Sequence, residues 1–181
     1  MTASSDWSCQ QGFFELETPW LKLLGEQWRD ETGATLNYWR IEKADSVIVI
    51  PLYDHHLLLP PPQYRPGIGA ATWDFPGGRL PSGQPPAAIA PVILQRELGL
   101  ATESIGTIQP INDSGWVVNS SFSNQRVFAM EALIQDSTDL KNLNIGQKIP
   151  ATQAGVGDLL KLLICLQCRA VLLEWWFLRH C

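Results

Sequence analysis

The chain has 181 residues, of which 45% are hydrophobic and 17% charged. This is the composition of an ordinary globular protein, which excludes disorder or a fibrous repeat for the chain as a whole. The formal net charge is −5 and the sequence contains no clustered basic stretch, so nucleic acid is not an expected ligand.

The first part of the chain predicts a loose tail followed by antiparallel strands. Residues 1–12 are polar and lack the basic and apolar regions of a secretory signal, so we expect a flexible N-terminal tail there. A single domain is expected over 13–181. Its first strands are predicted at about 13–42, where aromatic and aliphatic residues flank the turn Asp30-Glu-Thr-Gly33.

A buried hairpin and several further strands are predicted in the middle of the chain. The run from Ser46 to Leu52 is β-branched and almost continuously apolar, which is typical of a buried strand. Asp54-His55 then provides a two-residue turn into a second arm. Further strands are predicted at 70–75, 105–111, 116–118 and 126–134.

Two helical regions are predicted. The first begins at Pro86, a residue suited to the first helical turn, and ends at Gly99, which fits a C′ position. Pro91 lies inside it and is expected to kink or shorten the helix. Residues 156–178 have helical apolar periodicity and should cover one face of the sheet. Charged residues interrupt this segment, so no membrane span is expected.

The cysteines favour a reducing compartment. Four in a chain of this length do not make a disulfide framework, so the expected location is cytoplasmic. Cys165-x-x-Cys168 has the spacing of half a zinc site or of a redox pair. No second ligand pair lies at usable spacing, and the flanking leucines and isoleucine look like an apolar helix face. Buried thiols are therefore expected.

One stretch of the chain has the spacing of a known signature. The segment Trp73-Asp-Phe-Pro-Gly-Gly78 leads into residues that keep the pattern G-x5-E-x7-R-E-U-x-E-E-x-G-U without a gap, where U is aliphatic. With Gln63-x-Arg65 before it and Ser123-Asn-Gln-Arg126 after it, this stretch resembles the Nudix hydrolases, in particular the ADP-ribose and ADP-sugar pyrophosphatase branch. The resemblance implies an α+β fold, an α/β/α sandwich with a mixed sheet between helices and antiparallel N-terminal strands. The positions that match by type are Gly78, Leu94, Glu97, Gly99 and Leu100.

Residues 78–100, which we call the box, are degenerate as a Nudix signature. In the family, three glutamates on one helix face gather Mg²⁺ or Mn²⁺, which neutralises a diphosphate and positions a water. Here Glu97 is the one residual catalytic acid and metal ligand, and the backbone carbonyl of Gly77 is a doubtful second ligand. The resemblance therefore implies weak or lost hydrolysis, with a metal cofactor needed only if activity persists. The replaced charged positions carry Gln84, Val92, Ile93 and Arg96.

Several residues of the same stretch suggest an anion site. Arg65, Arg79 and Arg96 are candidates for binding a diphosphate, and Gln125 stands where the family has a substrate-contacting glutamate. Arg96 could replace the charge of the metal. The arginines also have a simpler interpretation as solvated charges or ion-pair partners. The first hypothesis is a protein that binds a nucleoside diphosphate sugar or related compound with little or no cleavage.

Two alternatives remain open. One is an active, metal-dependent pyrophosphatase that splits ADP-ribose-like substrates to AMP and a sugar phosphate. The other is a protein-interaction module, suggested by the apolar segment Glu174-Trp-Trp-Phe-Leu178. For all three, the resemblance implies a homodimer joined through the N-terminal strands.

Overall fold

The structure is a computed structural model that describes residues 7–180. These residues group into two compact units, whereas the sequence predicts one domain over 13–181. Unit 1 comprises the chain up to Ala44 together with Val117–Arg126. Unit 2 comprises Asp45–Trp116 and the chain from Val127 onward.

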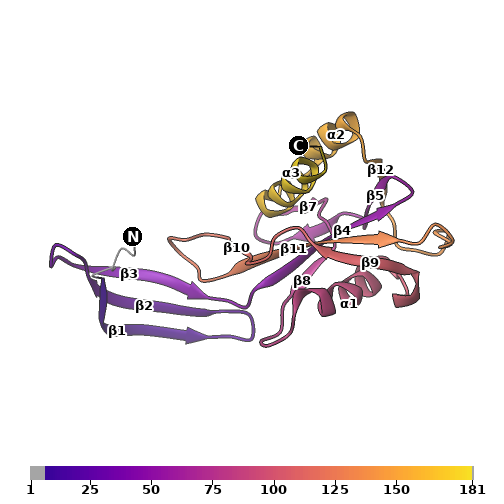
Figure 1. The fold of residues 1–181 in the computed structure, drawn as a ribbon. Helices are drawn as coiled ribbons and strands as arrows, with labels where there is room; N and C mark the ends of the chain where they lie inside the picture. Colours follow the sequence, from indigo (N-terminus) through magenta and orange to yellow (C-terminus); the bar gives the residue numbers. More distant parts are fainter. Residues whose placement is uncertain (1–6, 181) are drawn as a thin grey trace. The chain divides into compact units, whose positions relative to one another are not determined.

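Unit 1 is built on a three-stranded antiparallel sheet. Its strands are β1 (Ser8–Glu17), β2 (Lys22–Arg29) and β3 (Thr35–Glu42), in the order β1-β2-β3 (Figure 1). The N-terminal antiparallel strands predicted from the sequence are therefore present.

The first strand begins earlier than predicted. Ser8 pairs with Arg29 and Cys9 with Trp28, so residues 8–12 of the expected tail lie in a strand. Every residue of β1 is exposed, which explains why its polar start carries no alternating apolar pattern that would reveal a strand. Residues 1–6 lie outside the described part of the chain.

Unit 2 contains a mixed sheet ordered β10-β11-β4-β5-β12, with β8 paired to β4 and β9 to β11. The β4–β11 pairing is parallel, and β4 pairs antiparallel with both β5 and β8. A separate two-stranded sheet joins β6 to β7. The strands are β4 (Ser46–Tyr53), β5 (His56–Leu59), β6 (Gln63–Arg65), β7 (Ala70–Thr72), β8 (Gly77–Arg79), β9 (Ile105–Pro110), β10 (Trp116–Val117), β11 (Arg126–Ile134) and β12 (Gln147–Pro150).

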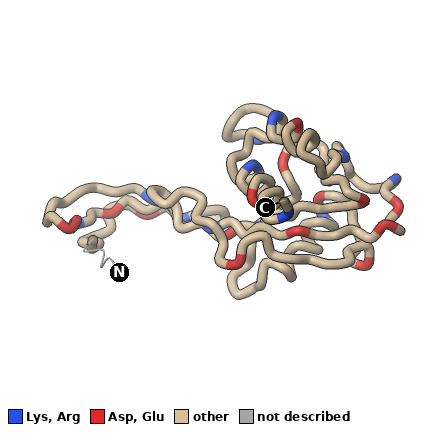
Figure 2. The backbone as a smooth tube through the Cα atoms, turned by 45° about the horizontal axis from the view of Figure 1, so that its top comes forward, with Lys and Arg blue, Asp and Glu red and all other residues tan. Residues whose placement is uncertain are grey.

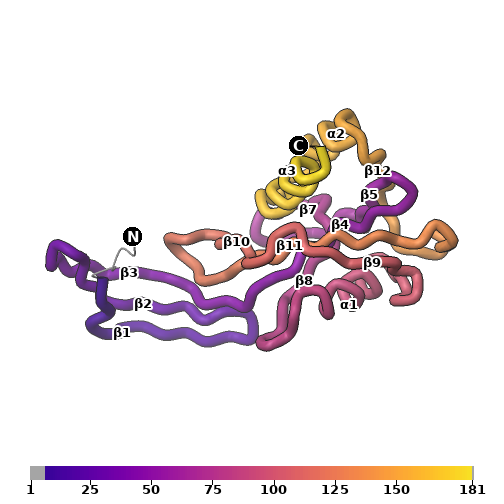
Figure 3. Tube along the Cα trace, in the orientation of Figure 1, coloured from indigo at the N-terminus to yellow at the C-terminus, as the bar shows by residue number. Residues whose placement is uncertain are grey.

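Helices cover both faces of this sheet. α1 (Pro86–Leu98) lies on one side, and α2 (Gln153–Leu162) and α3 (Leu166–His180) lie on the other (Figures 1 and 3). A short 3-10 helix, η1 (Thr102–Ser104), follows α1. The fold class is therefore α+β with a mixed sheet between helices, as predicted.

The predicted hairpin is present at the centre of unit 2. β4 is buried from Val47 to Pro51, in agreement with its continuous apolar sequence. Asp54 and His55 both have positive φ, at 45° and 57°, which is the backbone of a type I′ hairpin turn. The strong burial of this hairpin fixes its register and makes β4 the strand against which the neighbouring elements are placed.

Helix α1 has the predicted ends. Pro86 is at its first turn, and Gly99 caps it in the left-handed region with φ of 78°. The helix continues through Pro91 to Leu98, so it is not shortened, and the alternative expectation of a kink stays a prediction. Because proline has no backbone N–H, Pro91 cannot donate the helical hydrogen bond to the carbonyl of Ala87. Burial of the α1 face that packs on the sheet offsets that loss.

The C-terminal segment forms two helices where the periodicity predicts one. The break falls at 163–165, where the Arg169 guanidinium donates to the carbonyls of Leu160 and Leu163, the latter at 3.0 Å. These bonds satisfy backbone acceptors that a continuous helix would have used. Within residues 7–180, no helix has both the length and the apolar character required to cross a membrane.

Candidate functional site

The box is laid out as a strand, a loop and a helix. In β8, Gly77 pairs with Ile48 and Gly78 with Val47, so the backbone before the loop lies directly beside the central strand. α1 then packs against β4, β8 and β9. This layout brings the last turn of α1 back to the glycines that precede the loop.

Arg96 occupies the middle of this arrangement. Its Nη2 donates to the Gly77 carbonyl at 2.8 Å. Its Nε and Nη2 donate to Oε1 of Glu97 at 3.0 and 2.9 Å. The Arg96 guanidinium therefore bridges the two groups that the sequence analysis named as metal ligands.

The second oxygen of Glu97 is also engaged. Gln63 on β6 donates from Nε2 to Oε2 at 2.8 Å, and the Glu97 side chain is only 16% exposed. Side chains two residues apart on a strand share a face, so Arg65 projects from β6 on the same side as Gln63. The bond between Gln63 and Glu97 therefore joins β6, which carries the Gln-x-Arg motif, to helix α1.

Gly78 permits the close approach of α1. A Cβ at this position would lie 3.0 Å from Arg96 Nη2 and 3.2 Å from Ile93 Cγ1. Ile93 and Arg96 therefore share the helix face that looks toward β8, as the sequence predicts. Ile93, however, is 1% exposed and belongs to the apolar core with Val47, Leu94 and Leu98. A position that is acidic in the family signature is a core position here.

The box does not fit Mg²⁺ or Mn²⁺. These ions prefer several carboxylate oxygens, and residues 78–100 contain one carboxylate, that of Glu97. Both of its oxygens already accept hydrogen bonds, and the Gly77 carbonyl accepts from Arg96. The guanidinium also adds a positive charge that repels a divalent cation.

The remaining candidate arginines have different surroundings. Arg65 donates from Nε and Nη2 to Oδ2 of Asp74 at 3.0 and 2.7 Å, and its side chain stays 47% exposed. Arg79 is exposed at the end of β8, opposite Ser46. Figure 2 shows cationic and anionic positions interspersed along the backbone.

Gln125 belongs to unit 1, whereas the other candidate residues belong to unit 2. Its side chain is buried and donates from Nε2 to the Ala44 carbonyl at 3.0 Å, while its backbone amide donates to Ser123 Oγ at 3.1 Å. These bonds hold a loop of unit 1. A role for Gln125 in substrate binding stays a prediction.

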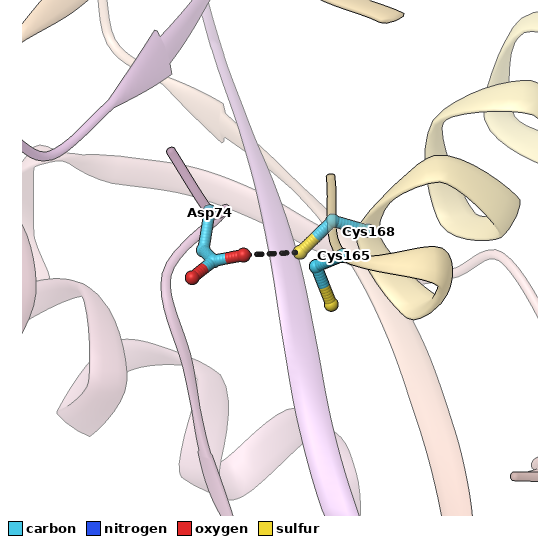
Figure 4. Close-up of side chains that lie close together, drawn as sticks. All are labelled: Asp74, Cys165 and Cys168. Carbon is cyan, nitrogen blue, oxygen red and sulfur yellow. Dashed lines mark hydrogen bonds between the residues drawn. The ribbon is translucent and has the colours of Figure 1, made fainter. Parts of the chain in front are cut away.

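A second polar cluster of unit 2 was missed in part by the sequence analysis. Cys168 is buried, as expected, whereas Cys165, which is also expected to be buried, is half-buried. Their surroundings are not apolar, because Asp74 lies beside them; Asp74, Cys165 and Cys168 together are called the cysteine cluster (Figure 4). A hydrogen bond from Cys168 lowers the pKa of Cys165 to about 6, whereas the bond to Cys165 and burial raise the pKa of Cys168.

Comparisons with known proteins bear on the fold. The sequence matches no protein-family model and none of the curated proteins. A solved structure described as the crystal structure of an ADP compounds hydrolase matches with a TM-score of 0.72 and 15% sequence identity. The match covers 96% of this chain and 96% of that chain. This likeness supports the Nudix-like fold that the sequence resemblance implies.

Proposed function

We propose that this chain binds a nucleoside diphosphate-linked compound, such as a nucleotide sugar, through a Nudix-like fold and hydrolyses it weakly or not at all. The observation that carries the proposal is the position of Arg96, which bonds to both the Gly77 carbonyl and the Glu97 carboxylate. The ADP-linked ligand class is supported by the name of the structural neighbour.

A guanidinium is suited to a diphosphate in the absence of metal. It is permanently charged, and its planar donors match phosphate oxygens in pairs. The Arg96 side chain is 56% exposed, so its outer donors remain accessible to a ligand while the inner ones are fixed. Arg79 on β8 supplies further positive charge, whereas the charge of Arg65 on β6 is already paired with Asp74.

The same arrangement opposes hydrolysis. In metal-dependent diphosphate cleavage the cation polarises the phosphoryl group and activates the water. Glu97 alone, with its oxygens bonded to Arg96 and Gln63, lacks the additional acids that would hold such an ion. An active pyrophosphatase with Mg²⁺ or Mn²⁺ is therefore an outcome to be tested rather than the favoured function.

The proposal is tested by calorimetric titration of the full chain with ADP-ribose in the presence of EDTA. Wild-type protein is expected to bind, and Arg96→Glu to weaken binding by at least about tenfold, because it removes a charge-assisted contact. Arg29→Glu makes the same charge change at an exposed position of unit 1 and is expected to stay within about twofold of wild type. No binding of ADP-ribose at millimolar concentration would refute the proposal.

A second candidate function is a protein-interaction module. It is favoured by apolar side chains on the outer face of α3, where Leu166, Leu173 and Phe177 are all exposed and lie on one stripe. A module of this kind has no nucleotide ligand. Thermal stabilisation by ADP-ribose separates the two functions, since only a ligand-binding protein gains stability.

We also propose a cytoplasmic homodimer. The sheet of unit 1 exposes Phe13, Phe14 and Trp39, and each Phe ring is in contact with the Trp39 ring. Trp20, in the connection between β1 and β2, is 73% exposed. Such a surface favours association. Sedimentation equilibrium of wild type against Trp20→Ser tests it, with a shift toward monomer expected in the variant.

A further inference from the structure

Three metal-ligating side chains meet in unit 2 away from the box. Asp74 lies in the loop between β7 and β8, Cys165 just before α3, and Cys168 in the first turn of that helix. Their ligand atoms all lie within 4.8 Å of one another. In Figure 4 a carboxylate oxygen of Asp74 faces the sulfur of Cys168, with Cys165 beside it.

We propose that Asp74, Cys165 and Cys168 form a binding site for Zn²⁺. The Cys-x-x-Cys spacing is that of half a zinc site, because two cysteines separated by two residues at the start of a helix place both sulfurs on one side. Here the backbone N–H of Arg169 donates to the Cys165 carbonyl at 3.0 Å and fixes that first turn. The remaining donor comes from a loop 94 residues away from Cys168.

Asp74 is oriented as a ligand by its neighbours. Its Oδ2 accepts from Thr72 Oγ1 at 2.7 Å and from the Arg65 guanidinium at 2.7 and 3.0 Å. Its Oδ1 is left to face the Cys168 sulfur at 3.7 Å. Outer hydrogen bonds of this kind hold a carboxylate in place so that its other oxygen can coordinate a metal.

The chemistry of the donors selects the cation. Thiolates are soft ligands that bind zinc and are poor ligands for Mg²⁺, which prefers oxygen. The negative charges of two thiolates and one carboxylate are balanced by Zn²⁺ together with the guanidinium of Arg65. Three protein donors leave a tetrahedral zinc ion one open position for water or another ligand.

The simpler interpretation is that these are ordinary core thiols. Free buried cysteines behave as small apolar side chains and pack against apolar neighbours. Cys168 instead has a carboxylate oxygen and a second sulfur beside it. Oδ2 of Asp74 is paired with Arg65, whereas Oδ1 faces sulfur atoms, an arrangement that a bound cation stabilises.

The test is a zinc titration of the full chain. The protein is first reduced, stripped of metal with EDTA, and freed of the reductant and the EDTA. It is then titrated with Zn²⁺ in competition with a chromophoric chelator. We expect uptake of one equivalent, and Co²⁺ in place of Zn²⁺ should give thiolate-to-cobalt absorption. A chain without Cys9 and Cys181, carrying C9S and C181S, keeps the site and is expected to bind like wild type.

Single variants assign the ligands. Cys165→Ser and Asp74→Asn are each expected to lower zinc affinity by more than about 100-fold. This is more than the loss of a hydrogen bond to a ligand usually causes, and Cys165 is half-buried, so serine is tolerated there. Thr72→Val removes only an outer hydrogen bond and should lower affinity by about tenfold. Circular dichroism of each variant verifies that the fold is intact.

Three results would overturn the proposal. The first is zinc uptake by the reduced wild type that is no tighter than that of Cys165→Ser. The second is uptake that C9S and C181S abolish. The third is a Cys165–Cys168 disulfide in the purified protein combined with no zinc uptake after its reduction, which would make the pair a redox couple.

Discussion

The box and the cysteine cluster are two polar sites of one unit, and they differ in what lies between their donors. The box keeps the spacing of the Nudix signature, but a guanidinium lies between its carboxylate and the Gly77 carbonyl. The cysteine cluster belongs to no long signature, yet its three ligand atoms lie within 4.8 Å of one another. The spacing of a signature therefore predicts the path of the backbone, whereas the ligand that a site can bind depends on which side chains the fold brings together.

The largest predicted effect concerns a variant that returns an acidic residue of the Nudix signature to the box. Ile93→Glu restores an acid of the signature at a core position, and we expect it to lower the free energy of unfolding by about 3–5 kcal/mol, because the new carboxylate is buried beside an arginine, Arg96, that is already bonded to Glu97. Urea denaturation measures this. Ile93→Val, the matched control, is expected to cost only about 1 kcal/mol. A stable Ile93→Glu protein that binds Mn²⁺ would show that the box is still a metal site.

The next effect separates the two sites by their ions. Zn²⁺ at a hundredfold excess over its Kd is expected to stabilise wild type and Glu97→Gln by about 2.7 kcal/mol, and Asp74→Asn much less. Mg²⁺ at millimolar concentration is expected to change none of them. Thermal denaturation with each ion measures the difference. Stabilisation by Mg²⁺ that Glu97→Gln removes would reverse the assignment of the two sites.

A smaller effect compares two arginine–carboxylate contacts. Arg40 in unit 1 donates from Nε and Nη2 to both oxygens of Glu26 at 2.8 and 2.9 Å, and Glu26 is largely buried. Arg40→Gln is expected to cost about 1.5–3 kcal/mol. Arg96→Gln should cost less than about 1 kcal/mol, because the Arg96 side chain is more exposed. Equal losses in urea denaturation would mean that Arg96 serves stability rather than ligand binding.

The smallest effect is a pH dependence confined to unit 1. Hydrogen bonds from Arg40, and then from Trp28, lower the pKa of Glu26 from its ordinary value of 4.5. A group with a lowered native pKa stabilises the fold above its unfolded pKa, and that contribution disappears as the pH falls through the native value. The protection factors for hydrogen exchange in β2, which divide out the intrinsic pH dependence of the exchange reaction, should therefore fall below about pH 4.5 in wild type and much less in Glu26→Gln. Identical profiles would contradict this.

The parts of the fold that local signals determine were predictable. Pro86 and Gly99 mark the ends of α1 because proline suits the first turn and glycine adopts the left-handed cap. Asp54 and His55 form the predicted turn between two buried strands. In each case the residues that decide the structure are neighbours in the sequence.

Contacts between distant segments were not predictable. The break between α2 and α3 is stabilised by the Arg169 side chain, which donates to backbone carbonyls. The apolar periodicity of a sequence does not indicate such bonds. The Cys-x-x-Cys pair was visible, but its third donor, Asp74, becomes adjacent only when α3 packs in the folded unit. The bond between Arg96 and the Gly77 carbonyl likewise depends on how α1 returns to β8.

The most direct test of the central claim is the affinity of the wild-type chain for ADP-ribose, measured by calorimetry with EDTA and again with Mg²⁺, while chromatography monitors release of AMP. If Arg96 takes the place of the cation, the two Kd values will agree and no AMP will appear. Binding that requires Mg²⁺, or AMP formed in its presence, would contradict the account.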